Sequence, residues 1–82
     1  MTLKQVSDTN AQLFHSVNLD WYVDGFVFWC SYTVKDEAEY IIRTLISLLQ
    51  HFYPQLQIDR HFTKGSNILM WGPSLLSDFK HG

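Results

Sequence analysis

The segment from Asp36 to Tyr53 constrains the fold most, because its apolar residues repeat with the spacing of an α-helix. At 3.6 residues per turn, these side chains fall within one stripe about 160° wide. The stripe contains Ala38, Ile41, Ile42, Leu45, Ile46, Leu48, Leu49, Phe52 and Tyr53. Pro54 ends the helix, since proline disfavours the helical conformation in the residue before it. We therefore expect one long amphipathic helix whose apolar face packs against a sheet.

Residues 17–34 have the pattern of a β-hairpin. Apolar and polar residues alternate up to Asp24-Gly25, a dipeptide typical of a two-residue type I′ turn. In the register that this turn sets, Val23 pairs with Phe26 and Leu19 pairs with Cys30. The expected core face then holds Val17, Leu19, Trp21, Val23, Phe26, Phe28, Cys30 and Tyr32. The register is self-consistent, because apolar residues from both strands fall on the same face.

The strand period returns after Pro54. Residues 56–62 alternate, residues 63–67 are typical of a turn, and residues 68–71 form a fourth apolar run before Gly72-Pro73. A final helical turn is expected at residues 74–79, whereas residues 1–12 are polar and expected to be loosely ordered. The order is ββαββ. We expect a single α+β domain over residues 1–82, with a small antiparallel sheet and the long helix on one face.

Composition fits such a domain and excludes several classes. The chain has 82 residues, of which 46% are hydrophobic and 16% aromatic, so even a small domain can form a substantial core. A net charge of −2 disfavours nucleic-acid binding, which depends on contacts to phosphates. Cys30 is the one cysteine, so no intramolecular disulfide is expected. The N-terminus has no signal-peptide pattern, and no apolar run is long enough to span a bilayer. These features predict a cytoplasmic protein without a membrane partner.

The face opposite the expected core is unusually apolar. It is expected to carry Tyr22, Val27, Trp29, His61, Leu69 and Trp71. Aromatic residues are enriched at protein–protein interfaces, so these six are candidate interface residues, including for a homodimer. An alternative is that a terminal segment, such as Leu75-Leu76-Phe79, covers this face.

Sites for chemistry are weakly indicated. Cys30 is a possible nucleophile, but the hairpin places it in the core, where thiols are inert. Asp59 and His61 lie two residues apart on one expected strand face and form a possible acid–base pair. The four histidines are too scattered to predict a metal site. No glycine-rich loop precedes a helix, so no nucleotide cofactor is expected.

These observations favour a small non-enzymatic protein–protein interaction or regulatory module that self-associates. Adaptor, inhibitor and regulatory-subunit roles remain open. One alternative is a small enzyme that uses Asp59 with His61, or Cys30. Another is a single-stranded nucleic-acid binder that stacks bases on the aromatic face, with Arg60 and Lys64 near the phosphates.

Overall fold

The chain forms a four-stranded antiparallel sheet with two helices, in a computed structural model that describes residues 2–73. The elements are α1 (Leu3–Thr9), β1 (Phe14–Tyr22), β2 (Gly25–Tyr32), α2 (Ala38–Phe52), β3 (Arg60–Lys64) and β4 (Asn67–Gly72). The α+β class and the antiparallel sheet are thus confirmed. The ββαββ order is incomplete, because α1 precedes β1. The helical turn expected at residues 74–79 lies outside the described residues.

Helix α1 replaces the loosely ordered segment expected at residues 1–12. A capping box begins it: the Gln5 backbone N–H donates to the Thr2 hydroxyl, and the Thr2 backbone N–H donates to the Gln5 side-chain oxygen. Val6 lies in the core at 5% exposure. Local capping and one buried apolar side chain therefore order a segment whose composition is largely polar.

Helix α2 carries the expected amphipathic stripe but is shorter than residues 36–53. A 3₁₀ turn, Lys35–Glu37, comes first, and the α-helix runs from Ala38 to Phe52. Its innermost positions are Ile41, Leu45 and Leu49, all at most 2% exposed. Pro54 follows the Tyr53 cap, as expected for a helix stop.

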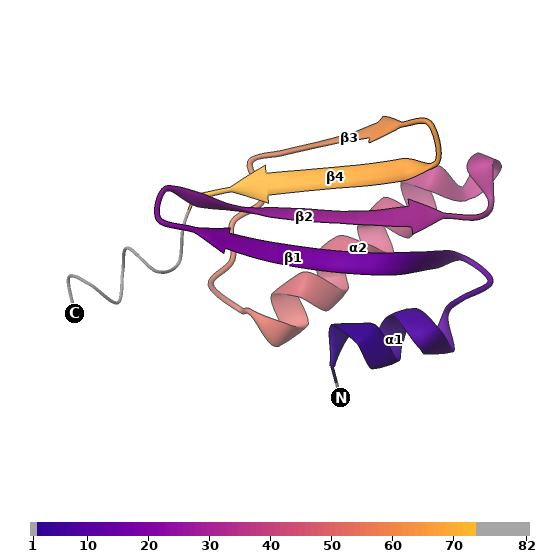
Figure 1. Ribbon diagram of the computed structural model, residues 1–82, viewed down its shortest axis with the longest axis horizontal. Helices are drawn as coiled ribbons and strands as arrows, with labels where there is room; N and C mark the ends of the chain where they lie inside the picture. The colour runs from indigo at the N-terminus through magenta and orange to yellow at the C-terminus, as the bar shows by residue number, and fades with distance from the viewer. Residues whose placement is uncertain (1, 74–82) are drawn as a thin grey trace.

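The strand order is β1-β2-β4-β3, so among the described strands β4 lies inside the sheet, and β1 and β3 form its edges. In Figure 1, α2 crosses behind the sheet and α1 lies beside β1. The core lies between the sheet and α2. It contains Phe14, Phe26, Phe28, Cys30, Tyr32, Ile68 and Met70 from the strands, together with the buried residues of α2 and Leu56. The opposite, outer face of the sheet does not face α2.

The first hairpin forms with a different turn from the expected one. Tyr22 pairs with Gly25, so Val23 and Asp24 make the connection, and neither has a positive φ. The type I′ turn at Asp24-Gly25 is therefore wrong. The true register pairs Trp21 with Phe26 and Leu19 with Phe28, a shift of two residues from the expected pairing.

Because side chains alternate with a period of two, this shift leaves the two faces of the hairpin unchanged. Phe26, Phe28, Cys30 and Tyr32 are buried as expected. Val17, Leu19 and Trp21 are partly buried and pack against the same core. Val23 is the exception: it lies in the turn and is 71% exposed.

Strand β1 begins at Phe14 rather than Val17, and a bulge interrupts it. The register shifts between His15 and Asn18, where Ser16 has a φ of 54°. The extra residues let Phe14 and Leu19 both face the core, although simple alternation would place them on opposite faces. Sequence alternation alone therefore missed the residues of this strand that precede Val17.

Candidate interaction surface

Cross-strand pairing arranges the outer-face side chains in rows across all four strands. One row runs Asp20, Val27, Trp71, Arg60, and the next runs Asn18, Trp29, Leu69, Phe62. A third row runs His15, Ser31, Asn67, Lys64. The apolar members of the first two rows are neighbours, and we call them the outer patch: Val27, Trp29, Phe62, Leu69 and Trp71.

Aromatic contacts organise the β3 side of the outer patch. The rings of Phe62 and Trp71 meet edge to face, with centroids 5.3 Å apart. The Arg60 guanidinium carbon lies 5.5 Å from the centroid of the Trp71 ring, a cation–π arrangement. In the third row, the Ser31 hydroxyl donates a hydrogen bond to the Asn67 side-chain oxygen, with 3.2 Å between the two oxygens. The contacts with Phe62 and Arg60 thus restrict the orientation of the Trp71 ring.

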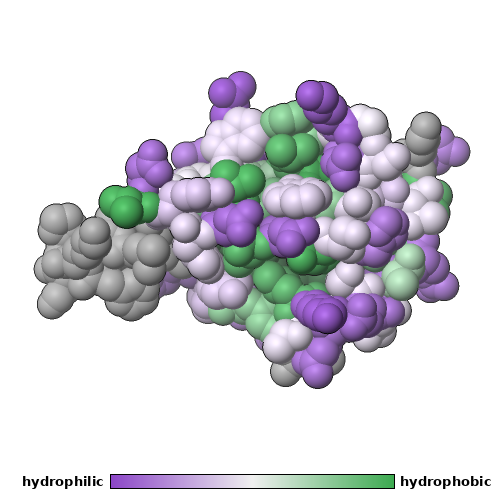
Figure 2. Space-filling view, in the orientation of Figure 1, coloured by the Kyte–Doolittle hydropathy of each residue, from purple (hydrophilic) through white to green (hydrophobic). Residues whose placement is uncertain are grey.

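The outer patch is substantially open to solvent. Trp29 is 38% exposed and Phe62 is 41% exposed, whereas Val27, Leu69 and Trp71 are half-buried between neighbouring side chains. Figure 2 looks onto this face, where apolar and near-neutral residues lie in the middle, with hydrophilic residues both among them and around the periphery. The face therefore combines exposed aromatic and apolar side chains with polar ones, as protein interfaces do.

Five of the six predicted interface residues share this face. Val27, Trp29, Leu69 and Trp71 belong to the outer patch, and Tyr22, 51% exposed, lies at the turn end of β1 on the same side. His61 does not join them. It pairs with Met70, whose side chain is fully buried, so His61 projects toward the helix side of the sheet.

The residue that sequence reasoning missed is Phe62. It pairs with Leu69 and occupies the outer-face position expected for His61. The signal was present in the sequence. Counting back from the Gly65-Ser66 turn, with Asn67 paired to Lys64, puts Phe62 on the same side as Leu69. The strand expected at residues 56–62 in fact runs from Arg60 to Lys64, so the alternation that was extended from Leu56 and Ile58 put Phe62 on the wrong face.

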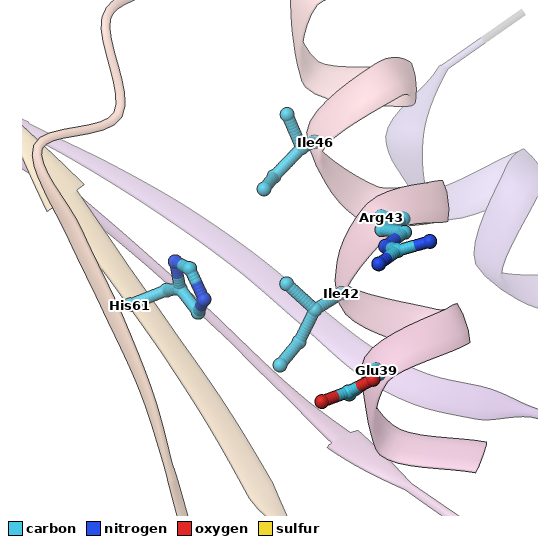
Figure 3. A pocket seen from close by; sticks show the side chains of 5 residues that line it. All are labelled: Glu39, Ile42, Arg43, Ile46 and His61. Carbon is cyan, nitrogen blue, oxygen red and sulfur yellow. The ribbon is translucent and has the colours of Figure 1, made fainter.

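His61 instead lines a groove between β3 and α2. The groove has a volume of about 220 Å³, and its other lining residues are Glu39, Ile42, Arg43 and Ile46. Figure 3 shows Ile42 and Ile46 projecting from α2 toward His61. The groove thus has an apolar helix wall with charged side chains beside it.

The possible catalytic groups are not assembled for chemistry. Cys30 is fully buried, and this burial raises the pKa of its thiol from an ordinary value of 9.0 to about 12. A thiol of this kind is a poor nucleophile near neutral pH. Asp59 precedes β3, and its backbone N–H donates to the carbonyl of Trp71. Within residues 2–73, no hydrogen bond or ion pair joins the side chains of Asp59 and His61.

Among the described residues, no group of three or more His, Cys, Asp or Glu side chains is arranged to hold a metal ion. No helix within residues 2–73 has the length and apolar character needed to cross a membrane. Comparison with family models, curated proteins and solved structures found no match to this chain.

Proposed function

We propose that this protein is a small interaction module that uses the outer patch to bind a protein partner, and that a second copy of the chain is such a partner. The observation that carries this proposal is the contiguous outer patch, in which Trp29 and Phe62 keep about two-fifths of their surface exposed. Large aromatic side chains at the centre of a surface supply much of the binding free energy in protein complexes.

Charge placement supports self-association. In one row, Asp20 lies on β1 and Arg60 on β3, with Val27 and Trp71 between them. A two-fold axis parallel to the strands, between β2 and β4, would stack two outer faces and reverse this row in the second copy. Asp20 of each copy would then face Arg60 of the other, and Trp29 would cover Leu69. Two packed sheets in this arrangement bury their apolar centres about 10 Å apart.

Sedimentation velocity over a range of concentrations tests the proposal. The wild type is expected to dimerise with increasing concentration, whereas Trp29→Glu stays monomeric, because an interface cannot bury an unpaired carboxylate without a large cost. Tyr40→Glu is the matched control, since Tyr40 is 56% exposed on α2, away from the outer face. It should dimerise like the wild type. A wild type that remains monomeric at the highest concentration would refute self-association.

A charge exchange tests the two-fold arrangement itself. Asp20→Arg and Arg60→Asp should each weaken the dimer, and the double variant should regain most of the affinity, because the pair is restored with its signs reversed. Equal weakening in the single and double variants would exclude this geometry. Circular dichroism of each variant checks that the fold is retained.

Single-stranded nucleic acid is a second candidate partner. Arg60 and Lys64 lie on either side of Phe62 on the outer face, and Arg60 stacks on Trp71. Aromatic side chains beside cations suit stacked bases and their phosphates. Fluorescence anisotropy with a labelled oligothymidylate tests this candidate. Binding that falls steeply as salt rises would support it, and no binding at low salt would exclude it.

A further inference from the structure

The two edges of the sheet differ in how they are protected. Edge strand β1 contains the bulge at Ser16, and α1 lies beside it (Figure 1). Edge strand β3 is regular, contains no proline, and pairs through all five residues with β4. Within residues 2–73, no strand pairs with its other side. Bulges and covering elements are common devices that prevent unwanted strand pairing, and within residues 2–73 only the β1 edge has them. The β3 edge instead carries the charged residues Arg60 and Lys64.

An open edge presents unpaired backbone N–H and C=O groups to solvent, and an added strand can satisfy them. In complexes formed by strand addition, backbone hydrogen bonds supply affinity, and pockets for alternate side chains supply specificity. The β3 edge has such a pocket beside it. His61 from β3 faces Ile42 and Ile46 from α2 across the groove (Figure 3). Every second side chain of an added strand would point toward this groove.

The charges near β3 indicate which strand would fit. The chain has a net charge of −2, yet three of its six Lys and Arg residues lie here: Arg60 and Lys64 on β3, and Arg43 on the groove. Glu39 lines the same groove four residues from Arg43, so the positive charge that bears on an added strand is that of Arg60 and Lys64. Arg60 and Lys64 are four residues apart on the outer face, with Phe62 between them. A neighbouring strand with acidic residues at two positions four apart, and an apolar residue between them, would pair with all three.

The same charges disfavour the β3 strand of a second copy as the neighbour. An antiparallel pair centred on Phe62 would place Arg60 of each copy opposite Lys64 of the other, and like charges directly opposite are destabilising. We propose that the β3 edge accepts an extended segment of a partner protein that has two acidic residues four positions apart and apolar residues between them. The segment adds to the sheet as a fifth strand, and its inward apolar side chains lie in the groove between β3 and α2.

The probe is a capped peptide, Ser-Glu-Val-Val-Val-Glu-Ser, which places its glutamates opposite Arg60 and Lys64 in either strand direction. The control peptide has lysine in place of both glutamates. Binding is followed by NMR, which locates the perturbed residues. The glutamate peptide should bind about tenfold more tightly than the lysine peptide. The chemical-shift changes that the glutamate peptide causes should concentrate in β3 and at Ile42 and Ile46.

Two variants make the experiment decisive. Arg60→Glu with Lys64→Glu should reverse the preference, so that the lysine peptide binds more tightly. Trp29→Glu should leave peptide binding unchanged, because Trp29 lies on β2, which β4 separates from the β3 edge, and because this proposal does not depend on self-association. The proposal is overturned if neither peptide binds, if the two bind equally, or if the shifts concentrate at β1 or at Trp29.

Discussion

Phe62 and Trp71 meet edge to face across the β3–β4 pair, with an interplanar angle of 79°. They are diagonal neighbours, since Phe62 pairs with Leu69 and Trp71 pairs with Arg60. This contact ties the short edge strand to the interior strand on the solvent side of the sheet. On the other side, β3 contributes no buried residue. The stability of β3 therefore depends strongly on the Phe62–Trp71 contact, although the Phe62 side chain is exposed to solvent.

The coupling between these two rings can be measured with a double-mutant cycle. Phe62→Leu and Trp71→Leu are each expected to lower the free energy of unfolding, with a coupling of about 0.5–1.5 kcal/mol between them. Urea denaturation of the four proteins gives this value. A coupling near zero would mean that the rings do not interact in solution. Phe62→Leu with Tyr40→Leu provides a control pair of distant aromatic residues, expected to be additive.

Replacing Gly72 should be far more costly than replacing Gly65. A Cβ atom at Gly72 would collide with the carbonyl oxygen of Gln57 and lie 3.0 Å from the Phe26 ring. A Cβ at Gly65 would meet no atom within 4 Å, although its φ of 61° is unfavourable for alanine. Gly72→Ala should lower stability by about 3 kcal/mol or more, and Gly65→Ala by about 1 kcal/mol. Thermal melting of both variants checks this order, which a smaller loss in Gly72→Ala would contradict.

Helix α2 supplies a prediction about the core. Leu49 is fully buried, whereas Ser47 is exposed on the same helix. Leu49→Asp should unfold the domain, because it places an unpaired charge between α2 and the sheet. Ser47→Asp, the same new side chain on the solvent side, should change stability little. Circular dichroism spectra of the two variants should therefore differ sharply, and a folded Leu49→Asp would show that the helix faces another way.

Cys30 should make the protein less stable at alkaline pH. Burial raises its pKa to about 12, so between pH 9 and pH 12 the unfolded chain releases a proton that the folded chain keeps. The unfolded state binds fewer protons in this range, and stability falls as pH rises, by up to about 1.4 kcal/mol per pH unit. Below pH 9 this contribution is constant.

Comparison with Cys30→Ala isolates the thiol from the other groups that titrate in this range. The variant should lose stability less steeply above pH 9, as measured by urea denaturation at several pH values. Parallel profiles for the two proteins would contradict the burial of the thiol. In native buffer near neutral pH, the wild-type thiol should also react slowly with a thiol reagent and rapidly in denaturant.

The features that the sequence predicted well depend on the period of the apolar pattern. Helix α2 and the buried set Phe26, Phe28 and Cys30 follow directly from spacing. The first hairpin shows why such predictions are robust. Its turn was wrong and its register was two residues out, yet an even shift keeps every side chain on its face. The outer face could be predicted for the same reason.

The missed features depend on single residues rather than on periods. The bulge at Ser16 adds residues to one strand, and a repeating pattern of apolar residues does not predict it. Helix α1 is ordered by one capping box and by Val6. His61 was assigned to the outer face because residues 56–62 were expected to alternate as one strand, whereas β3 begins only at Arg60 and places Phe62 on the outer face. The groove beside it required the tertiary placement of α2.

The place of β4 in the sheet has a consequence for how the chain folds. β4 is the last strand within residues 2–73, but it lies between β2 and β3, so the sheet stays divided until residues 67–72 are available. During synthesis, the first hairpin and α2 would emerge while the edge of β2 that pairs with β4 is still open. Such species are prone to aggregate, and closing long loops slows folding. Ribosome-bound chains stalled within α2 should therefore be digested by protease, and resistance should appear only once β4 has emerged.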